Sequence, residues 1–369
     1  MSSSGTIGTH DGRFHCDEVF AVFLLRQLPE FENYSVVRTR DMDVLANCDV
    51  LVDVGSIYDP EKFKFDHHQR EFDVTWSSFF NIKSYDVKLS SAGLVYAHFG
   101  KRVLSLMTNL EEDSESLQRL FYKVYESFVL EIDGSDNGIA PSNGPTKYHI
   151  LSGLSSRVQR LGPWWNEDSQ NNEEGFWKAY DMIEQEFRDV VKYFHKCWLP
   201  AREFVIRAMN QRESVDTSKA IIVLERSCPW KTHLRELEKE ERSKTVIYPL
   251  PPHLTNGRGE PKLPPKVLFV ILPGDNDNWI AQCVPSEKFE SRLPFPEEWR
   301  SLQNDELSRV SGIPGCIFVH SCGHLGVNQT KEGALAMARA VVRKRESEEN
   351  APLPKPTFSR GRGSRDRRR

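Results

Sequence analysis

Short apolar runs alternate with helical patterns through the first two hundred residues, and this alternation restricts the fold more than any other feature of the chain. Four runs are typical of β-strands, at residues 6–8, 35–38, 50–54 and 63–65. Helical patterns cover residues 18–28, 91–99, 115–132 and 174–198, the last closed by Pro200. The alternation predicts an α/β layer with a largely parallel sheet, and we assign residues 1–200 to a first domain.

The second half of the chain predicts a smaller α/β or α+β domain over residues 201–350. Strand-like runs stand at residues 220–224, 246–248, 267–272, 280–284 and 316–319, and a helical pattern follows at 331–344. The proline-containing stretch 249–265 predicts a surface loop. Residues 351–369 are rich in Pro, Arg, Gly and Ser, and we predict that they form a disordered tail.

Composition and charge exclude several classes of protein. The longest apolar runs are far shorter than the roughly 18 residues of a membrane-spanning helix, and the sequence identifies no protein partner. Seven cysteines without a C-x-x-C pair favour a reducing compartment. The first residues resemble neither a signal peptide nor a transit peptide, so we expect the nucleus and the cytoplasm.

Basic charge is concentrated at one end of the chain. The net charge is -4, yet residues 360–369 carry six Arg and one Asp. The acidic remainder argues against a nucleic-acid patch over the whole surface and leaves open a local basic channel. We interpret the tail as an RNA tether or a nuclear import signal; a merely solubilising tail is the alternative.

Histidines and aspartates recur where the first predicted strands end. They are His10, His15, Asp17, Asp53, Asp66, His67 and His68. Imidazole and carboxylate together suit Mn, Co or Zn, and several carboxylates can bridge two ions. We therefore predict a centre for two divalent metal ions at the carboxyl edge of the sheet. Asp136, Asp11 and Glu18 are assigned structural roles, with Asp136 in a turn.

The segments around these residues resemble the DHH phosphoesterase superfamily, and in particular its melanocyte-proliferating-gene branch. The resemblance rests on Thr9-His-Asp-Gly-Arg-Phe-His-Cys-Asp-Glu18, Phe65-Asp-His-His-Gln-Arg-Glu-Phe72 and later segments, and it covers about residues 6–345. It implies a DHH domain holding two metals, a smaller C-terminal domain, and 3′-to-5′ exonuclease action on RNA. It also allows a mitochondrial location, for which the sequence shows no leader.

The resemblance implies a ligand set for each ion. His10, His15 and Asp53 would hold one, and Asp17, Asp53, His67 and Asp133 would hold the other. His15 stands where many superfamily members carry a carboxylate, which shifts the expected preference from Mg toward Mn. In the implied two-metal attack of water on phosphorus, His68 would contact a phosphate oxygen or protonate the leaving oxygen, and Asp66 would orient its neighbours.

Further residues in the second half are predicted to contact substrate. Trp230, Lys231 and His233 could stack a base and bind phosphate, with Trp230 as a packing residue in the alternative interpretation. Arg202 is a weaker phosphate ligand. The segment 320–327 is interpreted as a loop before a helix in which Gly323 and Gly326 let backbone amides face a phosphate; a metal cluster of its His and Cys residues is the less favoured interpretation.

The combined prediction is a manganese-dependent phosphodiesterase that shortens single-stranded RNA from the 3′ end. Two alternatives remain open at this stage. The same metals could serve hydrolysis of a smaller substrate, such as pyrophosphate, a nucleotide bisphosphate or a short oligonucleotide. The chain could also be a catalytically silent RNA-binding scaffold that metals stabilise.

Overall fold

The computed structural model describes residues 5–80, 85, 87–142, 144, 148–245, 263–286 and 290–349. The chain divides into two compact units, Met1–Pro200 and Ala201–Arg369. The predicted strand at 246–248, most of the predicted loop at 249–265 and the tail 351–369 lie outside the described residues. Within the described part of the chain, no helix is long and apolar enough to cross a membrane.

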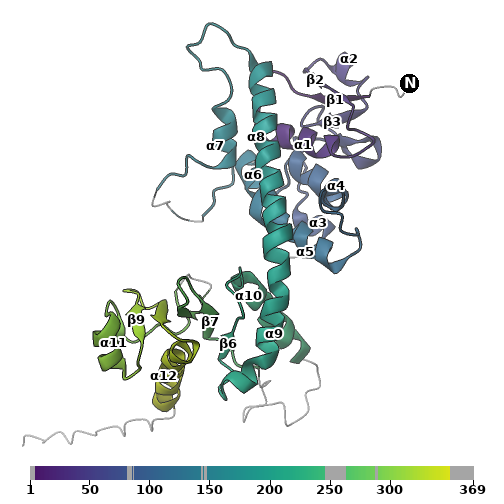
Figure 1. Cartoon of the computed structure of the whole chain (residues 1–369). Coiled ribbons are helices and arrows are strands. Elements are labelled where there is room, and N and C mark those ends of the chain that lie inside the picture. Colours follow the sequence, from purple (N-terminus) through teal and green to yellow (C-terminus); the bar gives the residue numbers. More distant parts are fainter. Residues whose placement is uncertain are drawn as a thin grey trace, which may run out of the picture. The chain divides into compact units, whose positions relative to one another are not determined.

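The first unit contains a five-stranded sheet in the order β2-β1-β3-β5-β4, of which β1, β2 and β3 are labelled in Figure 1. Its strands are β1 (Thr6–Thr9), β2 (Ser35–Arg38), β3 (Val50–Val52), β4 (Tyr58–Asp59) and β5 (Lys64–Phe65). β1 pairs in parallel with β2 and β3, β3 pairs in parallel with β5, and β4 is antiparallel to β5. The predicted α/β character is confirmed, and four of these strands follow the apolar runs of the sequence.

Successive side chains of the strands face opposite sides of the sheet, as strand geometry requires. Val50 and Val52 join the main core, whereas Leu51 packs with Leu45 on the other side. Helices that supply the main core include α1 (Cys16–Arg26), α4 (Ser91–Thr108), α5 (Glu115–Val124) and α8 (Asn172–Tyr193). Shorter elements are α2 (Met42–Leu45), η1 (Pro60–Lys62), α3 (Trp76–Phe79), η2 (Tyr125–Val129), α6 (Leu130–Asp136) and α7 (Leu154–Gln159).

The helix predicted to end before Pro200 continues past it, so the predicted helix end is wrong. α8 runs into a π-helical turn, η3 (Phe194–Trp198), and then into α9 (Leu199–Val215). At the turn the amide of Leu199 donates to the carbonyl of Phe194, five residues back. Proline usually breaks a helix because it lacks an N–H and its ring meets the carbonyl four residues earlier. The widened register just before Pro200 accommodates it.

The second unit contains a mixed five-stranded sheet in the order β6-β7-β8-β10-β9. Its strands are β6 (Ile221–Val223), β7 (Phe269–Pro273), β8 (Trp279–Cys283), β9 (Cys316–Val319) and β10 (Leu325–Asn328). Only β6 and β7 pair in parallel. The remaining elements are α10 (Lys231–Thr245), η5 (Glu297–Trp299), α11 (Asn304–Ser311) and α12 (Lys331–Glu349). Alternate residues of β7 enter two separate cores, one including α12 and the other α9 and α10.

Candidate metal centre

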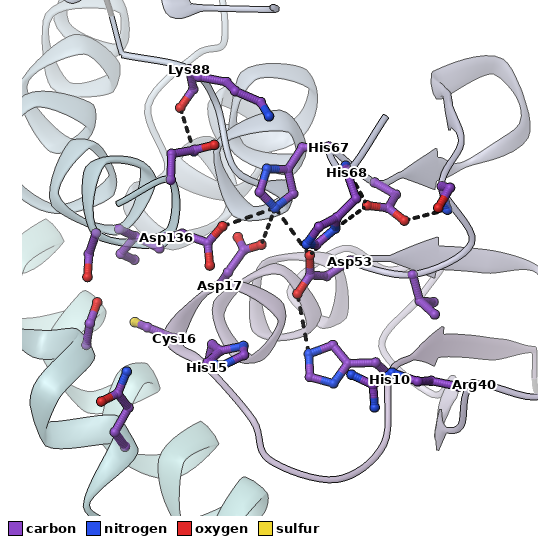
Figure 2. A pocket seen from close by; sticks show the side chains of 18 of the residues that line it. His10, His15, Cys16, Asp17, Arg40, Asp53, His67, His68, Lys88 and Asp136 are labelled. Carbon is purple, nitrogen blue, oxygen red and sulfur yellow. Dashed lines mark hydrogen bonds and ion pairs between the residues drawn. The ribbon is translucent and has the colours of Figure 1, made fainter. Parts of the chain in front are cut away.

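Three neighbouring strands of the first unit deliver acidic and imidazole side chains to one cavity. His10 follows β1, Asp53 follows β3, and His67 stands two residues after β5. Because these strands are parallel and adjacent, their carboxyl ends meet at one edge of the sheet. The cavity has a volume of about 900 Å³ and is also lined by His15, Asp17, Asp66, His68 and Asp136 (Figure 2). The sheet edge thus brings seven of the eight predicted metal and catalytic residues together.

Asp53 occupies the middle of the cluster. Its Oδ2 lies 3.4 Å from Nε2 of His10, and its Oδ1 lies 3.4 Å from Nε2 of His67. The residue has a φ of +57°, a left-handed conformation that Asp and Asn adopt more readily than most residues. The backbone turn at the end of β3 therefore places a carboxylate whose two oxygens face different imidazoles, the position that a bridging ligand requires.

His67 faces three carboxylates. Its Nε2 lies 3.0 Å from Oδ2 of Asp136, 3.4 Å from Oδ1 of Asp53 and 3.8 Å from Oδ2 of Asp17. The ring is buried, and among the described residues neither ring nitrogen has a hydrogen-bond partner of good geometry. Several carboxylate oxygens that converge on one ring nitrogen without a well-directed hydrogen bond are the arrangement expected of ligands around a cation.

Asp136, predicted to lie in a turn, is the last residue of α6, so that prediction is wrong. The helix continues through Gly134 and Ser135 and is capped by Asn137, whose side chain donates to the carbonyl of Asp133 at 2.9 Å. This extra helical turn carries the Asp136 carboxylate to His67 (Figure 2). Sequence reasoning missed the residue because Gly-Ser-Asp-Asn-Gly is also favourable turn chemistry.

Asp133, the ligand that the resemblance implies, is not brought into this cluster. Its Oδ1 accepts hydrogen bonds from the amide and hydroxyl of Ser90, and its Oδ2 accepts one from Tyr125. The carboxylate packs against Gly93 so closely that a Cβ at Gly93 would collide with it. Burial raises the pKa of Asp133 to about 7, although the hydrogen bonds from Ser90 oppose the shift. In this structure Asp133 ties α6 to the start of α4.

Glu18, assigned a structural role from sequence, belongs to both the helix and the cluster. Its carboxylate accepts the amide N–H of His15, which precedes α1, at 2.9 Å. Its Oε1 also lies 3.2 Å from Nε2 of His10. His15 is exposed, and its ring centroid lies 5.6 Å from that of His10. The sequence did contain a signal for the hydrogen bond between His15 and Glu18, because a Glu three positions after the residue that precedes a helix is typical of a capping box.

Asp66 holds His68 in place. Its Oδ1 lies 2.8 Å from Nδ1 of His68 and also accepts the amide of that residue, while its Oδ2 accepts the amide of Ser56. The hydrogen bond to Asp66 raises the pKa of His68, and burial opposes the rise. Asp66 is buried and His68 is exposed. The pair therefore presents an oriented ring to the cavity, while Asp66 also accepts two backbone amides.

The cluster requires positive charge. Burial disfavours the charged forms of His10 and His67, yet their carboxylate neighbours outweigh burial and raise both pKa values to about 10. Burial alone would raise the pKa of Asp53, but the two imidazoles lower it below its usual range. Burial, followed by Asp136 and Asp53, raises the pKa of Asp17. Protons balance the carboxylates here, and divalent cations would supply the same balance.

The donor atoms fit a metal centre. The donors form three groups, and within each group the donor atoms lie within 4.8 Å of one another. The groups are His10, His15, Glu18 and Asp53; Asp53, His67 and His68; and Asp17, His67 and Asp136. Imidazole nitrogen and carboxylate oxygen are ligands for Mn, Zn, Co and related ions. The arrangement can hold a divalent metal ion, and the side chain of Asp53 is shared between the first two groups.

Two basic side chains also line the cavity and were missed in the sequence. They are Lys88, which precedes α4, and Arg40, which precedes α2 (Figure 2). Lys88 lies 5.2 Å from the ring centroid of Phe72, and Arg40 forms an ion pair of 2.7 Å with Asp11. Isolated basic residues carry no sequence signal for such a position. Here they place positive charge at the border of an acidic cavity, where a phosphate would be attracted.

The predicted substrate residues of the second unit are mostly engaged within the fold. Trp230 and His233 are buried, so neither is available for the predicted contacts with bases or phosphate. Arg202 pairs with Glu236 and Glu240 of α10, at 3.3 and 2.8 Å. Lys231 is exposed, and with burial and His320 it lowers the pKa of His324. Of this group, Lys231 alone keeps the accessibility that the prediction requires.

Residues 320–327, predicted to form a loop directly before a helix, form a β-hairpin instead, so that placement is wrong. β9 and β10 are antiparallel neighbours, and α12 starts only after β10. The carbonyl of Gly323 accepts the amide of Phe295, and a Cβ at Gly326 would press on Met337 and Phe295. Both glycines are needed for close packing, which explains their presence without a ligand.

The fold and the cluster define an α/β protein with a carboxylate–histidine centre suited to divalent metal. A model of the MYG1 exonuclease family, described as "Uncharacterised protein family (UPF0160)", matches residues 6–342. The chain belongs to this family, which confirms the family resemblance predicted from its motifs; membership of the wider DHH superfamily stays a prediction.

Curated relatives agree with this assignment. The chain is 45% identical to the MYG1 exonuclease of Mus musculus over 94% of this chain and 86% of that protein. It is also 45% identical to the MYG1 exonuclease of Homo sapiens, over 92% and 86%. Among solved structures, RecJ in complex with Mn2+ from Thermus thermophilus is 13% identical, with coverage of 91% and 52% and a TM-score of 0.23, too low to support a conclusion.

Proposed function

We propose that this protein is a metal-dependent phosphodiesterase of DHH type that removes nucleotides from the 3′ end of single-stranded RNA. It would use two divalent metal ions, and Mn2+ is the ion we expect it to prefer. The observation that carries the proposal is the position of Asp53, whose two oxygens face His10 and His67 on opposite sides. Family membership supports a nuclease hydrolase, because relatives are named exonucleases.

We divide the side chains into two ligand sets and assign Asp53 to both, because its oxygens lie 3.4 Å from Nε2 of His10 and 3.4 Å from Nε2 of His67. His10, with His15 or Glu18 beside it, would hold one ion, and Asp17, His67 and Asp136 would hold the other. Two ions in such a centre supply activation of water and neutralisation of the phosphate charge. We assign to Asp136 the role that the resemblance gave to Asp133, because Asp136 is the carboxylate that reaches His67.

The remaining residues would position substrate and move a proton. Lys88 and Arg40 would contact non-bridging phosphate oxygens at the rim of the cavity. His68, oriented by Asp66, would donate its proton to the oxygen that leaves phosphorus. The exposed Lys231 remains a proposed RNA contact in the second unit.

The test is degradation of a 5′-labelled single-stranded RNA of about 20 nucleotides by metal-stripped protein resupplied with Mn2+, Mg2+ or Zn2+. We expect a Mn2+-dependent ladder that shortens from the 3′ end and disappears in Asp53→Asn and His67→Ala. A 3′-labelled copy of the same RNA should release labelled mononucleotide at once, which separates this polarity from 5′-to-3′ action.

Three other outcomes would contradict parts of the proposal. Equal cleavage of the matching DNA would remove the preference for RNA. Turnover of pyrophosphate or dinucleotides without an RNA ladder would indicate a small-substrate hydrolase. Metal-dependent thermal stabilisation without turnover of any phosphate ester would favour a silent scaffold.

A further inference from the structure

The hairpin between β9 and β10 carries a second cluster of metal-binding donor types. His320 follows β9, His324 precedes β10, and Cys322 lies between them. The sulfur of Cys322 lies 3.2 Å from Nδ1 of His320 and 3.0 Å from Nδ1 of His324. The two ring centroids are 4.3 Å apart. The three donor atoms lie within 4.8 Å of one another, in the second unit of the chain.

The backbone of the hairpin holds this arrangement. The amide of His320 donates to the carbonyl of Leu325 at 3.0 Å, and the amide of Gly323 donates to the carbonyl of His320 at 2.8 Å. Gly323 has a φ of +70°, which lets the chain reverse so that the two imidazoles face each other. The amide of Cys283 in β8 donates to the carbonyl of His324 at 2.9 Å and fixes the loop to the sheet. The donors are therefore preorganised by backbone contacts.

Hydrogen bonds within the hairpin engage this cluster: the amide of Cys322 donates to Nδ1 of His320 at 3.3 Å, and the sulfur of Cys322 lies 3.0 Å from Nδ1 of His324. A thiol has one proton and can donate to one imidazole at a time. The same three atoms present one sulfur and two ring nitrogens toward a common point, a donor set that suits zinc and other borderline or soft cations. Around tetrahedral Zn2+, sulfur and nitrogen ligands stand about 3.5 Å apart, so the spacings seen here require only a small expansion.

We propose that His320, Cys322 and His324 form a binding site for a borderline transition-metal cation, and that Zn2+ is the ion the site binds. Binding forms one Zn–S and two Zn–N bonds, and the thiol proton of Cys322 passes to solvent. His320 and Cys322 are exposed and His324 is half-buried, so the fourth position is open to water. This site does not depend on the proposed nuclease function, because it shares no residue with the cluster of the first unit.

The experiment measures protection of Cys322 from alkylation in the full-length protein. Metal-stripped protein is treated with a maleimide with and without Zn2+, and modification is located by peptide mass spectrometry. We expect Zn2+ to slow modification of Cys322 by roughly tenfold or more, because a coordinated thiolate is a poor nucleophile. The exposed Cys197 is the internal control and should react at the same rate in both samples.

Variants distinguish this site from the metal centre of the first unit. His320→Ala and His324→Ala should restore the reactivity of Cys322 in the presence of Zn2+, whereas Asp53→Asn should leave the protection intact. With Co2+ as probe, the near-ultraviolet thiolate-to-cobalt absorption should vanish in Cys322→Ser and persist in Cys197→Ser. An unchanged alkylation rate with Zn2+, or protection that survives both histidine substitutions, would overturn the proposal.

Discussion

Oδ2 of Asp136 lies 3.0 Å from Nε2 of His67, whereas Asp133 on the same helix is bonded to Ser90. This difference predicts opposite results for two isosteric substitutions. Asp136→Asn should weaken Mn2+ binding by roughly tenfold or more, and Asp133→Asn should change it little. Titration calorimetry, or the paramagnetic resonance of free Mn2+, measures the affinity. A larger loss in Asp133→Asn would return the ligand role to that residue.

Asp133 also predicts how stability depends on pH. Burial raises its pKa to about 7 in the folded protein, against an ordinary value near 3.8. Between these values the folded state holds a proton that the unfolded chain has released, so the free energy of unfolding falls as pH rises, on the order of 1 kcal/mol per pH unit. The loss levels off above about pH 7. Urea unfolding from pH 4 to 8 should show a shallower decline in Asp133→Asn than in the wild type; parallel curves would refute the shift.

The left-handed backbone conformation of Asp53 predicts different stabilities for two substitutions that both remove its carboxylate. Asn tolerates the left-handed φ of +57°, whereas Ala in that region is strained by about 1 kcal/mol. Both variants should lose metal-dependent cleavage, and Asp53→Ala should melt a few degrees below Asp53→Asn. Differential scanning calorimetry of the metal-free proteins checks the ordering. Equal melting temperatures would mean that the turn relaxes around Ala.

The pairing of Asp66 with His68 predicts a shift in the pH profile of cleavage. Since Asp66 raises the pKa of His68, Asp66→Asn should lower it and move the alkaline limb of kcat to lower pH. His68→Gln should reduce kcat by roughly a hundredfold or more while Mn2+ affinity stays within a few-fold. Single-turnover rates across pH test both statements. A profile that Asp66→Asn leaves in place would exclude His68 as the proton donor.

The arginine-rich tail predicts a salt effect on RNA binding. Removal of residues 358–369 should flatten the plot of log affinity against log salt concentration, because each phosphate contact contributes about 0.7 to the slope for single strands. Filter binding of a non-cleavable RNA between low and physiological salt measures it. A slope identical to that of the full chain would leave the tail without a tethering role.

The sequence predicted the centre of the site because strand ends are easily recognised. Apolar runs followed by His10, Asp53 and Asp66-His67-His68 locate the carboxyl ends of β1, β3 and β5. Because these strands are adjacent and parallel, the residues that follow them meet at one edge of the sheet. The same reasoning placed most strands within two residues of their observed bounds. These features depend on local patterns, which are present in the chain itself.

The helical part of the site could not be predicted in the same way. Asp133 and Asp136 are three residues apart, so they lie about 60° apart around a helix axis, and either could face the cavity. The π-helical turn η2 precedes α6 and rotates the face that later residues present. Burial of Trp230 and His233 is likewise a tertiary result, because an aromatic next to a lysine is equally compatible with a core position and with an exposed platform.

Asp17 accepts the amide of Ser91 at the start of α4 at 3.1 Å, and the same oxygen lies 3.8 Å from Nε2 of His67. The carboxylate of Asp17 thus contributes to the packing of α4 as well as to the proposed metal centre. A descendant lineage that abandoned catalysis would be free to replace His10 or His67, while position 17 would still be kept acidic by purifying selection on the fold. In a distant homologue, an acidic residue at position 17 would therefore indicate only that the fold is shared. Histidines at positions 10 and 67 would indicate that the proposed metal centre is also retained.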